Sequence, residues 1–102
     1  MNIFEKAGEA IYKDRHDDYG DALLCHEKIA KVWSGLLMGK LTKEITPQEV
    51  ALMMVGLKAV RETFKHKEDN LVDGSGYFGV TDLIEKALRA RRVMNNNRSN
   101  ED

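Results

Sequence analysis

Hydrophobic positions recur at helical spacing along most of the chain, with short polar segments between them. The spacing predicts helices over residues 2–13, 21–38 and 46–64, and from about residue 70 to residue 94. No segment shows the alternating pattern that is typical of a β-strand. The sequence therefore predicts an all-α fold, a compact bundle of about four helices.

The helix that starts near residue 46 has the clearest start signals. Thr46 can cap it, Pro47 suits the first helical position, and Glu49 completes a capping box with Thr46. The apolar face that follows is wide, which implies that this helix packs on two sides. Its methionines, Met53 and Met54, are expected to fill the core.

The last helix contains glycines that an isolated helix tolerates poorly. Gly74, Gly76 and Gly79 each cost about 1 kcal/mol relative to alanine. We expect a close approach between helices to compensate. Residues 95–102 contain no apolar side chain, so we expect a disordered tail after a single helical domain at 1–94.

Length, charge and cysteine content narrow the class of protein. A chain of 102 residues is most simply one domain. With 16 Lys and Arg against 17 Asp and Glu, no net field favours nucleic acid, so we do not expect a nucleic-acid partner. The single Cys25 favours a reducing compartment, and no segment has the pattern of a signal peptide or a membrane span. We expect a cytoplasmic protein with no membrane partner.

The segment DRHDDYGD, residues 14–21, concentrates four carboxylates beside an arginine and a tyrosine. The aspartates can ligate Mg²⁺ or cap the next helix, and we expect most of them to cap. Arg15 suits bidentate phosphate binding, and Tyr19, next to a glycine turn, can stack on a base.

Two further groups can bind an anion or a sugar. Lys58 and Arg61 are neighbours on one helix face, where an anion would relieve their repulsion; the alternative is a surface ion pair between Lys58 and Glu62. If the last helix begins at Asn70, three residues spaced four apart share one face and can together contact a ligand. These three are Asp69, Asp73 and Tyr77. The alternative is that Asp69 only caps the helix and the other carboxylate is an ordinary surface charge.

The motifs DRHDDYGD, IAKVWSGLL, ITPQEVALMMVGLKAVRE and DNLVDGSGY together resemble a family of small phage and prophage proteins. That family is distantly similar to the MazG-like all-α nucleoside triphosphate pyrophosphohydrolases and to nucleotide-modification-associated domains of phages. The resemblance covers about residues 11–88. It implies polar residues from several helices gathered around a nucleotide, usually in a homo-oligomer.

The chain departs from the MazG-like pattern in its carboxylates. Those enzymes carry Glu-Glu-x-x-Glu on one helix and Glu-x-x-Asp on another, because metal-dependent hydrolysis needs several carboxylates. Here the second helix offers Glu27, the third Glu49 and Glu62, and the last the pair Asp69 and Asp73. The remaining cations and aromatic rings suit holding a phosphorylated ligand better than cleaving it.

The leading hypothesis is a non-catalytic, phage-type protein that binds, and sequesters from host defence, a nucleotide or a nucleotide-derived cyclic signal. It needs no cofactor. We expect Arg15, Lys58, Arg61 and Tyr77 to converge on one hollow. The full set of expected ligand-binding residues is Arg15, Tyr19, Lys58, Arg61, Asp69, Asn70, Asp73 and Tyr77.

Two alternatives stay open. One is a Mg²⁺-dependent pyrophosphohydrolase of the MazG-like kind, in which Glu49, Asp69 and Asp73 would hold the metal. The other is a protein-interaction module whose third helix meets a host protein, and it predicts an exposed apolar patch.

Overall fold

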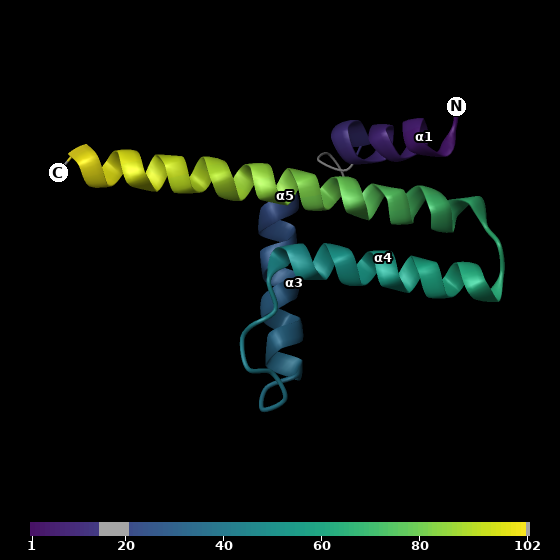
Figure 1. Ribbon diagram of the computed structural model, residues 1–102, viewed down its shortest axis with the longest axis horizontal. Helices are drawn as coiled ribbons and strands as arrows, with labels where there is room; N and C mark the ends of the chain where they lie inside the picture. The colour runs from purple at the N-terminus through teal and green to yellow at the C-terminus, as the bar shows by residue number, and fades with distance from the viewer. Residues whose placement is uncertain (15–20, 102) are drawn as a thin grey trace.

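The computed structural model describes residues 1–14 and 21–101, and the chain there is all-α, as the hydrophobic spacing predicted. Four α-helices and one short π-helix, η1, make up the fold (Figure 1). Their bounds are α1 Ile3–Glu9, η1 Ala10–Asp14, α3 Ala22–Leu36, α4 Pro47–Phe64 and α5 Glu68–Glu101. No helix of the described chain is both long and apolar enough to cross a bilayer.

The helices α4 and α5 run side by side in opposite directions and form the body of the fold (Figure 1). The start of α4 confirms the predicted capping box. Thr46 Oγ1 accepts a hydrogen bond from the Glu49 backbone N–H at 3.1 Å, and Glu49 Oε1 accepts one from the Thr46 backbone N–H at 2.9 Å.

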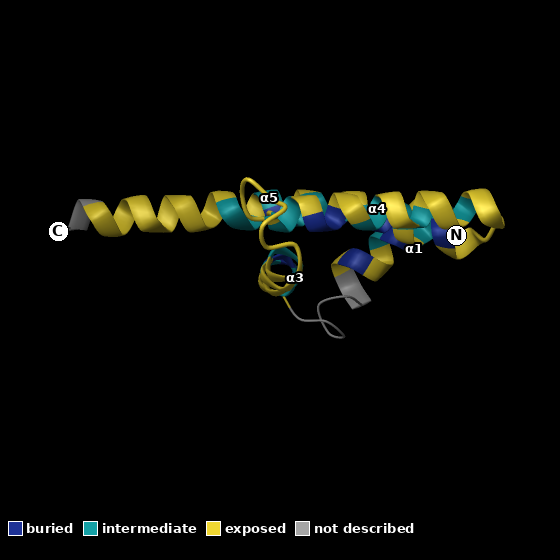
Figure 2. Cartoon of the chain, turned by 90° about the horizontal axis from the view of Figure 1, so that it is seen from below, coloured by how far each residue is buried: buried dark blue, intermediate teal, exposed yellow. Residues whose placement is uncertain are grey.

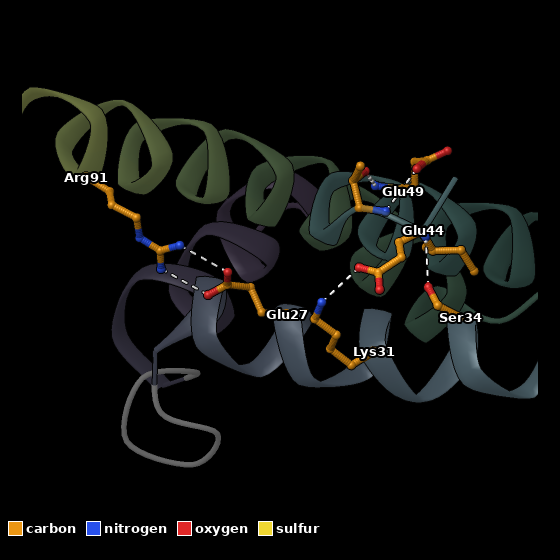
Figure 3. A network of polar contacts seen from close by, with 8 residues as sticks. Glu27, Lys31, Ser34, Glu44, Glu49 and Arg91 are labelled. Carbon is orange, nitrogen blue, oxygen red and sulfur yellow. Dashed lines mark hydrogen bonds and ion pairs between the residues drawn. The ribbon is translucent and has the colours of Figure 1, made fainter. Parts of the chain in front are cut away.

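The helix α3 crosses the α4–α5 pair at a steep angle, and Figure 2 shows it and η1 on the same side of that pair. Asp21 caps α3, accepting a hydrogen bond from the Leu24 backbone N–H at 3.0 Å, so this aspartate caps as expected. Polar pairs hold α3 in place (Figure 3). Arg91 binds both oxygens of Glu27, at 3.0 and 3.1 Å.

The core lies where η1, α3, α4 and α5 meet. Its buried members are Ile11, Leu23, Ala51, Val80 and Ile84. Two glycines of α5, Gly76 and Gly79, face the core residue Ile11, as the expected close approach requires. A Cβ atom on Gly79 would lie 2.6 Å from Ile11 Cδ1, so the absence of a side chain allows η1 to pack directly on α5.

Two expectations about α5 and α4 differ from the structure. The helix α5 includes residues 95–101, where we expected a disordered tail, since its helical backbone extends past Met94, the last apolar residue. Met53, expected in the core, is 48% exposed because it lies on the side of α4 away from α5.

Candidate functional site

A hollow of about 530 Å³ lies where the end of α4 meets the start of α5. We call it the basic hollow, because four of its lining side chains are cationic. The lining residues are Lys58, Val60, Arg61, Phe64, Lys65, Lys67, Asp69, Asn70 and Asp73. Five of the expected ligand-binding residues are thus brought together: Lys58, Arg61, Asp69, Asn70 and Asp73.

A second hollow of about 430 Å³ adjoins the first one along α5. We call it the apolar hollow, since most of its lining is aliphatic. It is lined by Ala10, Ile11, Cys25, Ile29, Val72, Asp73, Gly76, Tyr77 and Val80. Asp73 lines both hollows.

We expected Tyr77 to share one hollow with Lys58 and Arg61, and the structure differs on this point. Tyr77 lines the apolar hollow and not the basic one, because it lies one turn beyond Asp73 on α5, farther from the end of α4. Arg15 and Tyr19 lie outside the described residues.

Lys58 is paired across the helices. Its Nζ lies 3.0 Å from Asp73 Oδ2, and its side chain is only 15% exposed. The alternative pair with Glu62 does not form, because Glu62 accepts hydrogen bonds from His66, from the Lys67 backbone N–H at 2.9 Å and from Asn70 Nδ2 at 3.2 Å.

Asn70 anchors the corner between α4 and α5. It is 8% exposed, and its Nδ2 donates to Glu62 Oε1 at 3.2 Å and to the Lys65 carbonyl at 3.4 Å. The buried amide therefore fixes the backbone that carries Lys65 and Lys67. Asn70 acts on the hollow through this positioning as well as by lining it.

The charges of the basic hollow remain unbalanced after pairing. Four cations face two carboxylates, and Arg61 forms no ion pair within residues 1–14 and 21–101. An exposed arginine fork of this kind matches the paired oxygens of a phosphate. The hollow is therefore suited to an anion with several oxygens.

Sequence reasoning missed Lys65 and Lys67. Both belong to the corner KHKED, and the signal was a cluster of bases soon after Arg61, at the predicted end of the helix. Their place in the hollow depends on the direction in which α5 leaves that corner.

The metal site expected for the pyrophosphohydrolase alternative is not assembled within one chain. Glu49 lies in the capping box at the start of α4, whereas Asp69 and Asp73 lie beside the end of that helix. The 12 residues from Glu49 to Arg61 correspond to about 18 Å of helix. Across the described parts of the chain, no three His, Cys, Asp or Glu side chains are placed to share a metal ion.

The comparison with known proteins now identifies the family. The sequence profile described as "Domain of unknown function (DUF6378)" matches residues 2–85. The chain belongs to this family. The DUF6378 match includes every residue named in the linings of the two hollows.

The DUF6378 domain is also similar to the "Gene 55 protein" of Mycobacterium phage L5, with 41% identity over 87 residues. The match covers 83% of this chain and 53% of the relative, so the chain spans about half the length of that phage protein. The relation supports the expected phage family. No solved structure matches this chain.

Proposed function

We propose that this protein binds a nucleotide or a nucleotide-derived, including cyclic, signalling molecule, and sequesters it without turnover. The observation that carries the proposal is the adjoining pair of hollows, one basic and one apolar, with Asp73 in both linings. A nucleotide has the same order of parts: an anionic phosphate, a sugar with hydroxyl groups, and an aromatic base.

The basic hollow suits the phosphate. Arg61 offers two parallel N–H donors, and Lys65 and Lys67 add charge from the corner. Lys58 is held in position by Asp73, so its cation needs little reorganisation to meet a ligand.

The apolar hollow suits the base. Its aliphatic walls include Ile11, Ile29 and Val80, and Tyr77 supplies a ring with a polar hydroxyl at its edge. Asp73 lies between the hollows, where its carboxylate can accept hydrogen bonds from ribose hydroxyls. In the proposed phage setting, removing a signalling nucleotide from the host's defence requires affinity only.

A second candidate function is Mg²⁺-dependent hydrolysis of a nucleoside triphosphate. The observation that favours it is the presence of two carboxylates, Asp69 and Asp73, within the basic hollow. Mg²⁺ is commonly bound by one or two carboxylates together with substrate phosphates. Glu49 does not belong to this arrangement within one chain.

A thermal-shift screen of linear and cyclic nucleotides, with and without Mg²⁺, tests both candidates. Saturation at 100 times the dissociation constant adds about 2.7 kcal/mol, which raises the melting temperature by roughly 10 °C or more. A parallel assay measures phosphate and pyrophosphate release. Binding without release supports sequestration, steady release supports the enzyme, and no shift with any nucleotide contradicts both.

A further inference from the structure

One face of α4 carries apolar side chains that the described chain leaves partly or largely exposed. Met53, Leu57, Val60 and Phe64 are 48%, 38%, 67% and 92% exposed. Their spacing of four, three and four residues places them on a single narrow face of the helix. We call these four residues the α4 stripe.

The α4 stripe lies opposite the side of α4 that contacts α5. Gln48 Nε2 donates to Glu85 Oε1 at 2.8 Å, Lys58 pairs with Asp73, and Glu62 bonds to Asn70. These contacts use the far side of α4. The wide apolar face noted in the sequence thus has one side packed in the fold and one side open to solvent.

The exposed area of the chain exceeds what a monomer of its mass normally shows. A monomeric protein of 11.6 kDa exposes about 5,800 Å², whereas this chain exposes 7511 Å². The end of α5 projects beyond the other helices (Figure 1) and so adds exposed area, but its sequence there consists mainly of charged and amide residues. On α4, by contrast, the exposed residues include four large apolar side chains on one face.

The core is correspondingly small. In the part of the chain that the structure describes, its largest fully buried side chains are Ile84, His26, Val50 and Val80, with no Phe, Tyr or Trp among them. The chain measures only 18 Å along its shortest axis, and its radius of gyration of 15.9 Å exceeds the value of about 13 Å typical of this length. Additional burial would therefore add substantially to stability.

We propose that the α4 stripe is the interface of a homodimer, in which it packs against the same stripe of a second copy. An apolar stripe complements itself, as a two-fold interface requires. A standard interface buries about 800 Å² from each copy, and the chain as a whole exposes roughly 1,700 Å² more than a compact monomer of its mass, with the α4 stripe among its exposed apolar surface.

The dimer also bears on the basic hollow, and this step rests on the proposed function. Val60 and Phe64 belong both to the α4 stripe and to the lining of the basic hollow. A second copy on the stripe therefore covers the open edge of the hollow beside these two residues. Ligand binding and dimerisation then stabilise each other.

Light scattering coupled to size exclusion, on the full chain over a range of concentrations, measures the mass directly. We expect twice the 11.6 kDa of the chain for the native protein. Phe64→Glu and Met53→Glu place a charge in the interface and should each give the monomer mass. Phe4→Glu is the matched control, since Phe4 is 76% exposed on α1 and lies outside the stripe.

A native protein that is monomeric at every concentration overturns the proposal, even if a different protein is found to bind the stripe. A dimer that survives both stripe substitutions also overturns it. Far-UV circular dichroism verifies that each variant is folded. If both stripe variants unfold, Val60→Lys replaces them, and a dimeric Val60→Lys again overturns the proposal.

Nucleotide affinity distinguishes this proposal from the proposed function. Met53 does not line the basic hollow, so Met53→Glu changes affinity only through the dimer. We expect a several-fold weaker nucleotide affinity in that variant. A dimer that binds no nucleotide contradicts the proposed function alone, and a monomer that binds nucleotide contradicts the dimer alone.

Discussion

Lys58 Nζ and Asp73 Oδ2 lie 3.0 Å apart and join α4 to α5 where the basic and apolar hollows meet. The Lys58 side chain is 15% exposed and that of Asp73 47%, so the carboxylate is the partner that solvent reaches more readily. A ligand that spans both hollows meets Asp73 at the junction. The pair therefore links packing of the helices to recognition.

Asp73→Asn tests the balance of charge at this junction. Removing the carboxylate leaves Lys58 uncompensated, so we predict tighter binding of inorganic pyrophosphate, by up to about fivefold or 1 kcal/mol. Titration calorimetry measures this affinity. Asp82→Asn is the control, because Asp82 pairs with Lys86 and lines neither hollow. Equal affinities in the two variants would contradict the predicted role.

Gly79→Ala tests the close packing of η1 on α5. The added Cβ atom would meet Ile11 Cδ1 at 2.6 Å, and displacing this buried side chain costs more than the better helix propensity of alanine returns. We predict a loss of about 1 kcal/mol in the free energy of unfolding, measured by urea denaturation. Gly35→Ala, with no atom within 4 Å, should instead stabilise the protein slightly.

The α4 start and the close packing at the α5 glycines could be predicted because their causes are local. A capping box needs only Thr46 and Glu49, and the three glycines that lie close together in α5 indicate a close contact there. The partner of Lys58 could not be predicted in this way. It depends on the register of α5 against α4, which the corner at 65–67 sets.

The exposure of Met53 has a similar explanation. Periodicity shows which side chains of α4 share a face, but not which faces the other helices cover. The sequence singled out Lys58, Arg61 and Asp69, which line the basic hollow. It also placed Tyr77 with them, whereas Tyr77 lines the adjoining apolar hollow.

The pair of Glu62 and His66 gives the corner a defined pH dependence. The hydrogen bond from His66, followed by that from the Lys67 backbone, lowers the pKa of Glu62 from 4.5 to about 2, and Glu62 raises the pKa of His66 above 6.5. The carboxylate's contribution is present above pH 4.5 and is lost as the pH falls toward 2. The imidazolium's contribution is present below pH 6.5 and is lost as the pH rises through its raised pKa.

We therefore predict that this corner is most stable between pH 4.5 and 6.5. A nuclear magnetic resonance titration of His66 measures its pKa directly, and Glu62→Gln should return that pKa toward 6.5. An identical His66 pKa in the native protein and the variant would show that the contact does not form in solution.

The most direct test of the nucleotide pocket is calorimetric titration of the best nucleotide from the screen into three proteins: native, Arg61→Ala and Arg92→Ala. Arg61 lines the basic hollow, whereas Arg92 is exposed on α5 and lines neither hollow. We predict that Arg61→Ala weakens binding by about tenfold or more, as expected for a lost charge-assisted contact of about 1.5–3 kcal/mol, and that Arg92→Ala binds like the native protein. Equal affinities for all three proteins, or no binding to the native protein, would contradict a nucleotide pocket at the junction of α4 and α5.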